Sequence, residues 1–207
     1  MSFLAMGNVY GTLMNFRGEH DALGAAMNAP PYKAPPRAPV LYVKPANTWS
    51  ADGAEIALPA GVPEVEVGAA LGMVLKAPGD IAGYVLFTDL SLPQTSYYRP
   101  PVKSNCLDGF LGVGRSILRA EDNADAWQVD VTVSINGEVR RVVSFAHLVR
   151  SPAQLLADVS EFMTLKAGDV LLLGCDADRP RAKAGDRIEL SGPGLGTLAN
   201  TLVAEAA

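Results

Sequence analysis

Residues 127–144 read WQVDVTVSINGEVRRVVS. Apolar and polar side chains alternate from Trp127 to Ile135, which is the period of a strand that buries one face. The pair Asn136-Gly137 follows directly and favours a type I′ turn, because both residue types tolerate positive φ. We therefore predict a β-hairpin whose return strand runs from Glu138 to Ser144.

The sequence after this hairpin predicts one main amphipathic helix. Ser151 is a suitable N-cap, Pro152 fits the first helical position, and Gln154 has the capping-box spacing. Lys166 and Gly168 suit the end of the helix. The expected buried stripe consists of Leu155, Leu156, Val159, Phe162 and Met163.

Strands are expected to dominate the rest of the chain, because 15 prolines and 20 glycines divide it into short segments. The predicted fold class is a mixed, β-rich α+β fold, and residues 1–207 are expected to form a single domain. The further strands are predicted at Val9–Leu13, Val40–Val43, Val65–Leu75, Ile81–Thr88, Val170–Leu173 and Arg187–Leu190.

Composition excludes several classes of function. The net charge is -5, and no basic run is longer than Arg140-Arg141, so we expect no nucleic-acid partner. No apolar run approaches a membrane span of about 18 residues, and no basic segment precedes an apolar one at the N-terminus, so we expect a cytoplasmic protein. Two separated cysteines and two histidines leave oxygen as the only ligand type for a metal.

Several short segments, in this order, resemble the fumarylacetoacetate hydrolase family. They are Asn15-Phe16-Arg17, Val43-Lys44-Pro45, Ala82-Gly83-Tyr84 running on to Asp89, Asn136-Gly137-Glu138, residues 160–165, Gly168-Asp169-Val170 and residues 194–198. The resemblance covers nearly the whole chain. It implies an irregular β roll or barrel, a divalent-metal site and a substrate that is an oxo- or enol-acid.

More specific segments are similar to one branch of this family. They are residues 31–36 (PYKAPP), residues 89–93 (DLSLP), Tyr98-Arg99-Pro100 and Asp108-Gly109-Phe110. The branch decarboxylates 5-oxopent-3-ene-1,2,5-tricarboxylate and isomerises 2-hydroxyhepta-2,4-diene-1,7-dioate. The resemblance therefore implies an isomerase/decarboxylase subunit that acts on a small dicarboxylic acid.

The resemblance also implies a Mg2+ or Mn2+ ion held by a Glu-x-Glu pair and a later aspartate. In this sequence Gly68 and Ala70 stand where the two glutamates are expected, and Asp89 is the only matching ligand. We therefore expect this chain to bind the ion weakly or not at all. Glu64 and Glu66 have the same spacing and could replace the pair after a register shift, but a solvated strand entry is the favoured interpretation.

Other family positions are altered as well. Glu19 stands where a catalytic histidine is usual, with His20 beside it; Asn105 replaces a lysine and Cys175 a threonine. His20 is a candidate general base or else a solvent-facing residue. Cys175 is expected to be a small packing residue.

Each polar residue that this sequence shares with the family pattern has two possible interpretations. Lys44 could bind a substrate carboxylate or be a structural cation, and Asp89 could be a remnant ligand or a loop cap. Tyr98, Arg99 and Lys103 could bind a dianionic substrate, or they could serve a surface or interface.

Three hypotheses follow from the resemblance. The first is an enzyme subunit of the isomerase/decarboxylase. The second is a non-catalytic partner of a metal-bearing paralogous subunit, and the third is another oxo-acid hydrolase or decarboxylase of the family. We expect a homodimer or a hetero-oligomer with such a paralogue, because sheet edges need protection.

Overall fold

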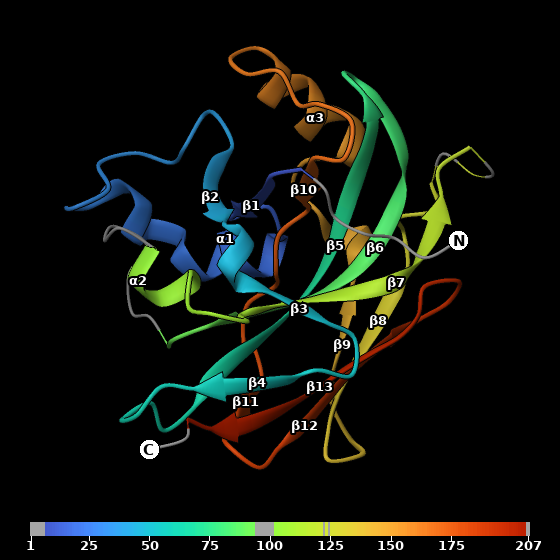
Figure 1. Cartoon of the computed structure of the whole chain (residues 1–207). Coiled ribbons are helices and arrows are strands. Elements are labelled where there is room, and N and C mark those ends of the chain that lie inside the picture. The colour runs from blue at the N-terminus through green and yellow to red at the C-terminus, as the bar shows by residue number, and fades with distance from the viewer. Residues whose placement is uncertain (1–6, 94–101, 122, 124, 206–207) are drawn as a thin grey trace.

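The computed structural model describes residues 7–93, 102–121, 123 and 125–205, and its strands form two sheets (Figure 1). The eight-stranded sheet contains β1 (Val9–Leu13), β2 (Val40–Lys44), β3 (Trp49–Ala51), β5 (Val65–Ala77), β6 (Asp80–Ser91), β7 (Leu111–Arg119), β10 (Val170–Leu172) and β11 (Arg181–Ala182). The five-stranded sheet contains β4 (Glu55–Leu58), β8 (Asp130–Ile135), β9 (Glu138–Ser144), β12 (Arg187–Gly192) and β13 (Gly196–Ala204). The helices are α1 (Arg17–Leu23), α2 (Val102–Asn105) and α3 (Pro152–Ser160), with 3-10 turns η1 (Gly24–Asn28), η2 (Ala46–Thr48) and η3 (Phe145–His147).

The order of strands in the larger sheet is β2-β1-β10-β5-β6-β7-β3, and β11 also pairs with β5. The smaller sheet has the order β4-β13-β12-β8-β9. The predicted β-rich α+β fold is thus confirmed, with strands as the main elements and α3 as the longest helix.

The long β5–β6 hairpin separates two apolar clusters, because successive side chains of a strand point to opposite faces. Val67 and Leu71 of β5 belong to the main core, which also includes residues of β8, β12 and α3. Ala70 and Val74 belong to a smaller cluster on the other face, together with Phe87 of β6. That second face also carries the candidate site described below.

The hairpin at Asn136-Gly137 is confirmed. Its φ angles of 54° and 79° are positive, as the turn requires, and β8 pairs with β9. However, β8 begins at Asp130 and not at Trp127. Residues 125–129 form turns instead, in which Val129 N–H donates to the Trp127 carbonyl.

The predicted helix is confirmed in α3, where the Ser151 side chain accepts from Gln154 N–H at 3.3 Å. The prediction for Phe162 was wrong, because this side chain is 61% exposed. The predicted helix end at Lys166 and Gly168 was also wrong: the helix ends at Ser160, so the chain has already left the helical path when it reaches Phe162.

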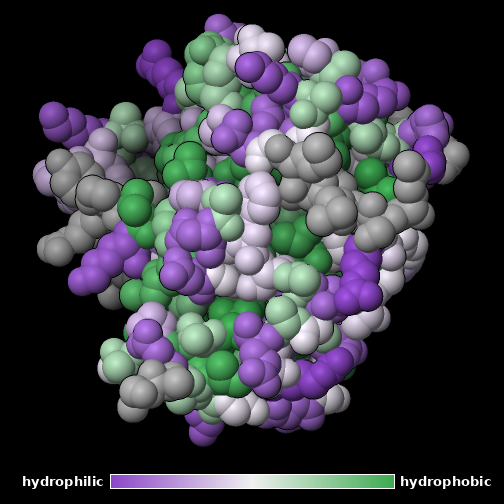
Figure 2. All heavy atoms as spheres, viewed as in Figure 1, coloured by the Kyte–Doolittle hydropathy of each residue, from purple (hydrophilic) through white to green (hydrophobic). Residues whose placement is uncertain are grey.

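Sequence patterns missed the helices α1 and α2 and five strands, β3, β4, β7, β11 and β13. None of the described helices has both the length and the apolar character needed to cross a membrane. On the face shown in Figure 2, hydrophobic residues are interspersed among hydrophilic ones.

Candidate functional site

The register of β5 against β6 decides what surrounds Asp89. Gly68 lies directly opposite Asp89, and Ala70 lies opposite Phe87. Opposed residues of an antiparallel pair share one face. The two positions expected to carry glutamates therefore lie on the same face as Asp89, and they hold a glycine and an alanine.

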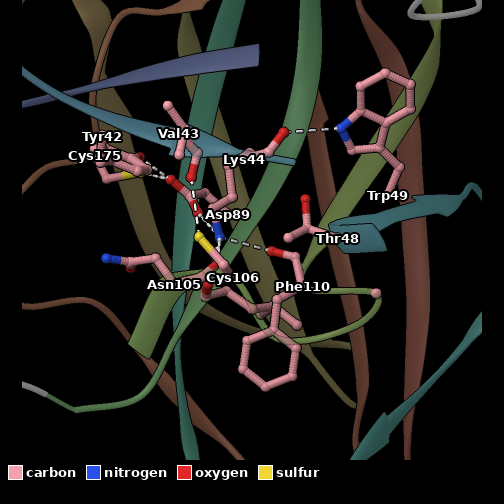
Figure 3. Close-up of polar contacts among 12 residues, drawn as sticks. Tyr42, Val43, Lys44, Thr48, Trp49, Asp89, Asn105, Cys106, Phe110 and Cys175 are labelled. Atoms are coloured by element: carbon pink, nitrogen blue, oxygen red, sulfur yellow. Dashed lines mark hydrogen bonds and ion pairs between the residues drawn. The ribbon is translucent and has the colours of Figure 1, made fainter. Parts of the chain in front are cut away.

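Both carboxylate oxygens of Asp89 are already engaged (Figure 3). The side chain is 3% exposed, and its Oδ1 lies 2.6 Å from the ammonium Nζ of Lys44. Its Oδ2 accepts a hydrogen bond from the Tyr42 hydroxyl, and the Cys175 thiol lies 3.8 Å from the same oxygen. The aspartate is thus held by protein groups alone.

Lys44 is fully surrounded by oxygen. Its ammonium donates to the backbone carbonyls of Leu90 at 2.8 Å, Asn105 at 2.7 Å and Phe110 at 3.0 Å. These bonds use the three donors that an ammonium has. The interpretation of Lys44 as a structural cation therefore fits its surroundings better than contact with a substrate.

Burial keeps the two neutral groups around Asp89 protonated. Desolvation, followed by the Asp89 charge, raises the pKa of Tyr42 well above 10.0. The same two causes raise the pKa of the Cys175 thiol far above 9.0. The Tyr42 hydroxyl is therefore a hydrogen-bond donor to Asp89 at neutral pH. Cys175 stays a thiol and is not a thiolate nucleophile.

Close packing leaves no room for a longer side chain at residue 68. A Cβ built on Gly68 would lie 2.6 Å from Cys175 Sγ and 2.7 Å from the Asp89 carbonyl oxygen. Ala70 is completely buried in the smaller apolar cluster. Neither position can hold a carboxylate without rearrangement of its neighbours.

Glu64 and Glu66 lie farther along the same hairpin. Glu64 precedes β5 and forms an ion pair with Arg181. Glu66 lies opposite Ser91 of β6, two residues beyond the Gly68–Asp89 pair. Burial raises the pKa of Glu66, an effect that Arg179 and Arg181 oppose.

These residues do not fit a divalent ion. Within the described parts of the chain, no three side chains of His, Cys, Asp or Glu are grouped to hold a metal. Mg2+ prefers several oxygen ligands at short range, whereas both Asp89 oxygens are bound to Lys44 and Tyr42. Instead, the Asp89 carboxylate is buried, and the Lys44 ammonium balances its charge.

Glu19, in α1, belongs to a second polar group beside Cys175. Its side chain is 2% exposed; Oε1 accepts from Arg179 Nη2 at 3.1 Å, and Oε2 accepts from Met14 N–H at 2.6 Å. Arg179 also donates through Nε to the Asp176 carbonyl. These bonds hold the Glu19 carboxyl group in a fixed position, and its partner Arg179 makes a structural role the simpler interpretation.

The other predicted site residues lie apart from this group. The His20 side chain is 38% exposed and its Nδ1 lies 3.2 Å from Asp21 Oδ1. Lys103 is exposed on α2, whereas Asn105 is buried and contributes its carbonyl to Lys44. Tyr98 and Arg99 lie outside the described residues.

A cavity of about 270 Å³ opens beside β1 and β2. Its lining includes Tyr10, Val43, Lys44, Pro45 and Trp49, and it contains none of Asp89, Glu19 and His20. The cavity therefore does not reach the Asp89 carboxylate, but it adjoins it through Lys44.

Sequence reasoning missed Tyr42 and Arg179. Tyr42 had a usable signal, because it lies in the predicted strand Val40–Val43 and is two residues before Lys44, a spacing that places both on one face when the strand continues to Lys44. A Cβ at Gly11 would overlap the Tyr42 ring, so that glycine makes room for it. Arg179 lies in a loop 160 residues from Glu19, and no periodic pattern links them.

Comparison with known proteins gives the same family as the sequence motifs. The family model described as fumarylacetoacetate (FAA) hydrolase, C-terminal, matches residues 8–203. The 4-hydroxyphenylacetate degradation bifunctional isomerase/decarboxylase of Salmonella dublin is 38% identical over 96% of this chain, and one from Escherichia coli is 36% identical over 96%. Each match covers 48% of the relative, so the chain spans about half the length of these curated relatives.

Solved structures agree on the fold. A 5-carboxymethyl-2-hydroxymuconate delta-isomerase from Mycobacterium smegmatis superposes with a TM-score of 0.81 at 23% identity, over 100% of this chain and 82% of that one. A fumarylpyruvate hydrolase from Pseudomonas aeruginosa, solved with Mn2+ and pyruvate, has a TM-score of 0.80 at 20% identity, over 96% and 90%. The chain belongs to the fumarylacetoacetate hydrolase family.

Proposed function

We propose that this chain is a subunit of an isomerase/decarboxylase that acts on a small dicarboxylic oxo- or enol-acid. The proposed steps are decarboxylation of 5-oxopent-3-ene-1,2,5-tricarboxylate and isomerisation of 2-hydroxyhepta-2,4-diene-1,7-dioate. The observation that carries this proposal is the 38% identity along 96% of the chain to a bifunctional isomerase/decarboxylase. The match extends over 48% of that relative, so the activity of the whole relative is a proposal for this chain.

Asp89 is buried and both of its oxygens contact protein groups, which limits how the subunit would work. Both proposed steps pass through an enolate-like state, whose negative charge needs a cation or other electrophile. Gly68, Ala70 and the occupied Asp89 do not supply a divalent site. We therefore place the Mg2+ or Mn2+ ion in a paralogous subunit that retains the paired glutamates, with this chain as its partner.

The contribution of this chain to substrate binding would come from the segment that follows β6. Lys103 is exposed on α2, and the hydrogen bond from Lys44 to the Asn105 carbonyl holds the end of α2. The positive charge of Lys103 suits one carboxylate of a dianionic acid. We assign the same role to Tyr98 and Arg99 on the basis of the sequence motif.

A non-catalytic, structural role within the same assembly is the second candidate. It is favoured by the pairing of Glu19 with Arg179, which turns the usual position of a catalytic histidine into a structural ion pair. The main core cluster draws residues from both sheets, which supports one domain that folds as a unit and can act as such a partner.

A turnover assay separates these possibilities. The dienol dioate is supplied with Mg2+ or Mn2+ to this chain alone, to the metal-bearing paralogue alone and to the mixture. We expect turnover to require or to be raised by the mixture. Rates that are unchanged by this chain would contradict the subunit proposal, and turnover by this chain alone would contradict dependence on the paralogue.

A pair of exposed lysines tests whether the chain touches substrate. In the mixture, Lys103→Met is expected to raise KM several-fold, while Lys76→Met is expected to leave it unchanged. Lys76 is a suitable control because it is a half-exposed lysine that forms an i,i+4 ion pair with Asp80, away from α2. Equal KM values for both variants would favour the purely structural role.

A further inference from the structure

The surroundings of Lys44 have the composition of a cation-binding cage. Four oxygens lie within 2.6–3.0 Å of Nζ: Asp89 Oδ1 and the carbonyl oxygens of Leu90, Asn105 and Phe110. The Lys44 side chain is 0% exposed, so no solvent completes the shell. Figure 3 shows Asp89, Asn105 and Phe110 converging on the ammonium from different segments.

One of the four oxygens is held by charge and not by a hydrogen bond. The three N–H donors of Lys44 go to the three carbonyls. Asp89 Oδ1 is buried and accepts no hydrogen bond, although it lies 2.6 Å from Nζ. An unpartnered buried oxygen is costly, so the positive charge itself stabilises Oδ1, as a spherical ion would.

Charge and distance both select a monovalent ion. The cage carries one negative charge, from Asp89, and three neutral carbonyls. A monovalent cation balances this set, whereas a divalent one would leave a buried positive charge. The distances of 2.6–3.0 Å suit an ammonium and exceed the roughly 2.1 Å that Mg2+ requires.

The cage joins segments that are distant in the sequence. Leu90 lies at the end of β6, Asn105 at the end of α2 and Phe110 just before β7. Leu90 N–H also donates to the Phe110 carbonyl, and Leu92 N–H donates to the Ser104 carbonyl. The ammonium therefore lies where the end of β6, the end of α2 and the start of β7 meet.

We propose that this cage is a monovalent-cation site whose resident ion is the tethered ammonium of Lys44, and that this ion fixes the end of β6 to α2 and to the start of β7. Shortening Lys44 empties the site without removing its oxygens. The vacated site then takes up a free primary ammonium or K+ in preference to Mg2+. Lys44 acts as a positioning residue for Lys103 and has no contact with the substrate.

Chemical rescue tests the proposal. Lys44→Ala removes the atoms that n-propylammonium replaces, so this ion is expected to raise the melting temperature of the variant by about 2–4 °C or more, beyond its effect on wild type. Ammonium and K+ should have smaller effects. Propan-1-ol, Na+ and Mg2+, at matched ionic strength where charged, should have little effect. Limited proteolysis within residues 102–110 should slow in parallel.

Leu190→Ala is the matched control, because Leu190 is also 0% exposed but lies in the smaller sheet. It is destabilised by a lost apolar side chain and offers no ion site, so n-propylammonium should not rescue it. Equal rescue of both variants, or a larger effect of Mg2+ than of the monovalent ions on Lys44→Ala, would overturn the proposal.

Nuclear magnetic resonance of the wild-type chain keeps the proposal testable if Lys44→Ala does not fold. The Lys44 ammonium protons should exchange slowly with water and show couplings to the carbonyl carbons of Leu90, Asn105 and Phe110. No coupling to the Asp89 carboxyl carbon is expected. Exchange as fast as that of the exposed Lys76 would contradict a closed cage.

Discussion

Gly68 faces Cys175 so closely that a Cβ added to the glycine would lie 2.6 Å from the thiol sulfur. The two residues come from β5 and from the loop after β10, and both lie beside Asp89. Residue 68 is the first of the two positions where a glutamate is expected, and a glutamate placed there would collide with Cys175. The thiol fills the volume into which a side chain at residue 68 would extend.

Gly68→Ala should therefore destabilise the fold by about 1–3 kcal/mol through overpacking. Cys175→Ala in the same chain should recover part of this loss, because it removes Sγ but leaves the Asp89 carbonyl oxygen 2.7 Å from the new Cβ. The free energy of unfolding in urea measures both effects. Gly192→Ala is the control, since its nearest neighbour lies at 3.2 Å; an equal cost at residues 68 and 192 would contradict the steric argument.

Divalent metal should not stabilise this chain. Lys44 and Tyr42 engage the two Asp89 oxygens, so Mg2+ or Mn2+ has no free carboxylate to bind there. We expect the same melting temperature in EDTA and in excess Mg2+, because ligands stabilise a protein only when they bind its folded state. A paralogue with intact glutamates serves as the positive control. A Mg2+-dependent rise that disappears in Asp89→Asn would show that the site does bind metal.

The ion pair between Glu19 and Arg179 should contribute to stability mainly through its burial. The side chains are 2% and 15% exposed, respectively. Arg179→Met leaves the Glu19 carboxylate buried without this guanidinium, so we expect a loss of about 3–5 kcal/mol. Adding Glu19→Gln should reduce the loss. The control is Arg187→Met, which breaks the exposed pair with Glu189 and should cost at most about 1 kcal/mol.

Chemical denaturation of the four proteins measures these differences. A cost for Arg179→Met no larger than that for Arg187→Met would indicate that Glu19 remains fully compensated by other groups. It would also weaken the interpretation of Glu19 as a structural anion that replaces the usual histidine.

Local patterns predicted those parts of the fold in which one face is buried by the chain's own core. The alternation that ends at Ile135 and the capping signal at Ser151 each specify an element without help from distant residues. β7 and β13 were missed because they contain glycines and polar residues, and long-range pairing holds them in place. β13, for example, is held between β12 and β4.

The site was less accessible to sequence reasoning because its partners are far apart. Asp89 could be identified from its motif, but its contact with Tyr42 spans 47 residues and that with Cys175 spans 86. Three of the oxygens around Lys44 are backbone carbonyls, which any residue can provide. The sequence therefore indicated which ligands were absent, but not which groups now hold Asp89.

The protonated thiol of Cys175 should make the fold sensitive to alkaline pH. Burial raises its pKa above 9.0 in the folded chain, whereas the unfolded chain can release this proton near that pH. Below pH 9 both states keep the proton, and the thiol has no pH-dependent effect. Above it only the unfolded state gains by ionisation, so stability falls by up to about 1.4 kcal/mol per pH unit for this one proton.

Cys175→Ala removes that contribution and should give a shallower decline of the unfolding free energy between about pH 9 and pH 11. The comparison uses slopes, because the lost packing lowers stability equally at every pH. Cys106→Ala is the matched control: burial also raises the pKa of Cys106, but this residue is only partly buried, so its slope should change less. The Tyr42 hydroxyl, whose pKa is also raised by burial, remains in both variants and accounts for a residual slope. Identical slopes for wild type and Cys175→Ala would mean that the thiol is not held in its neutral form beside Asp89.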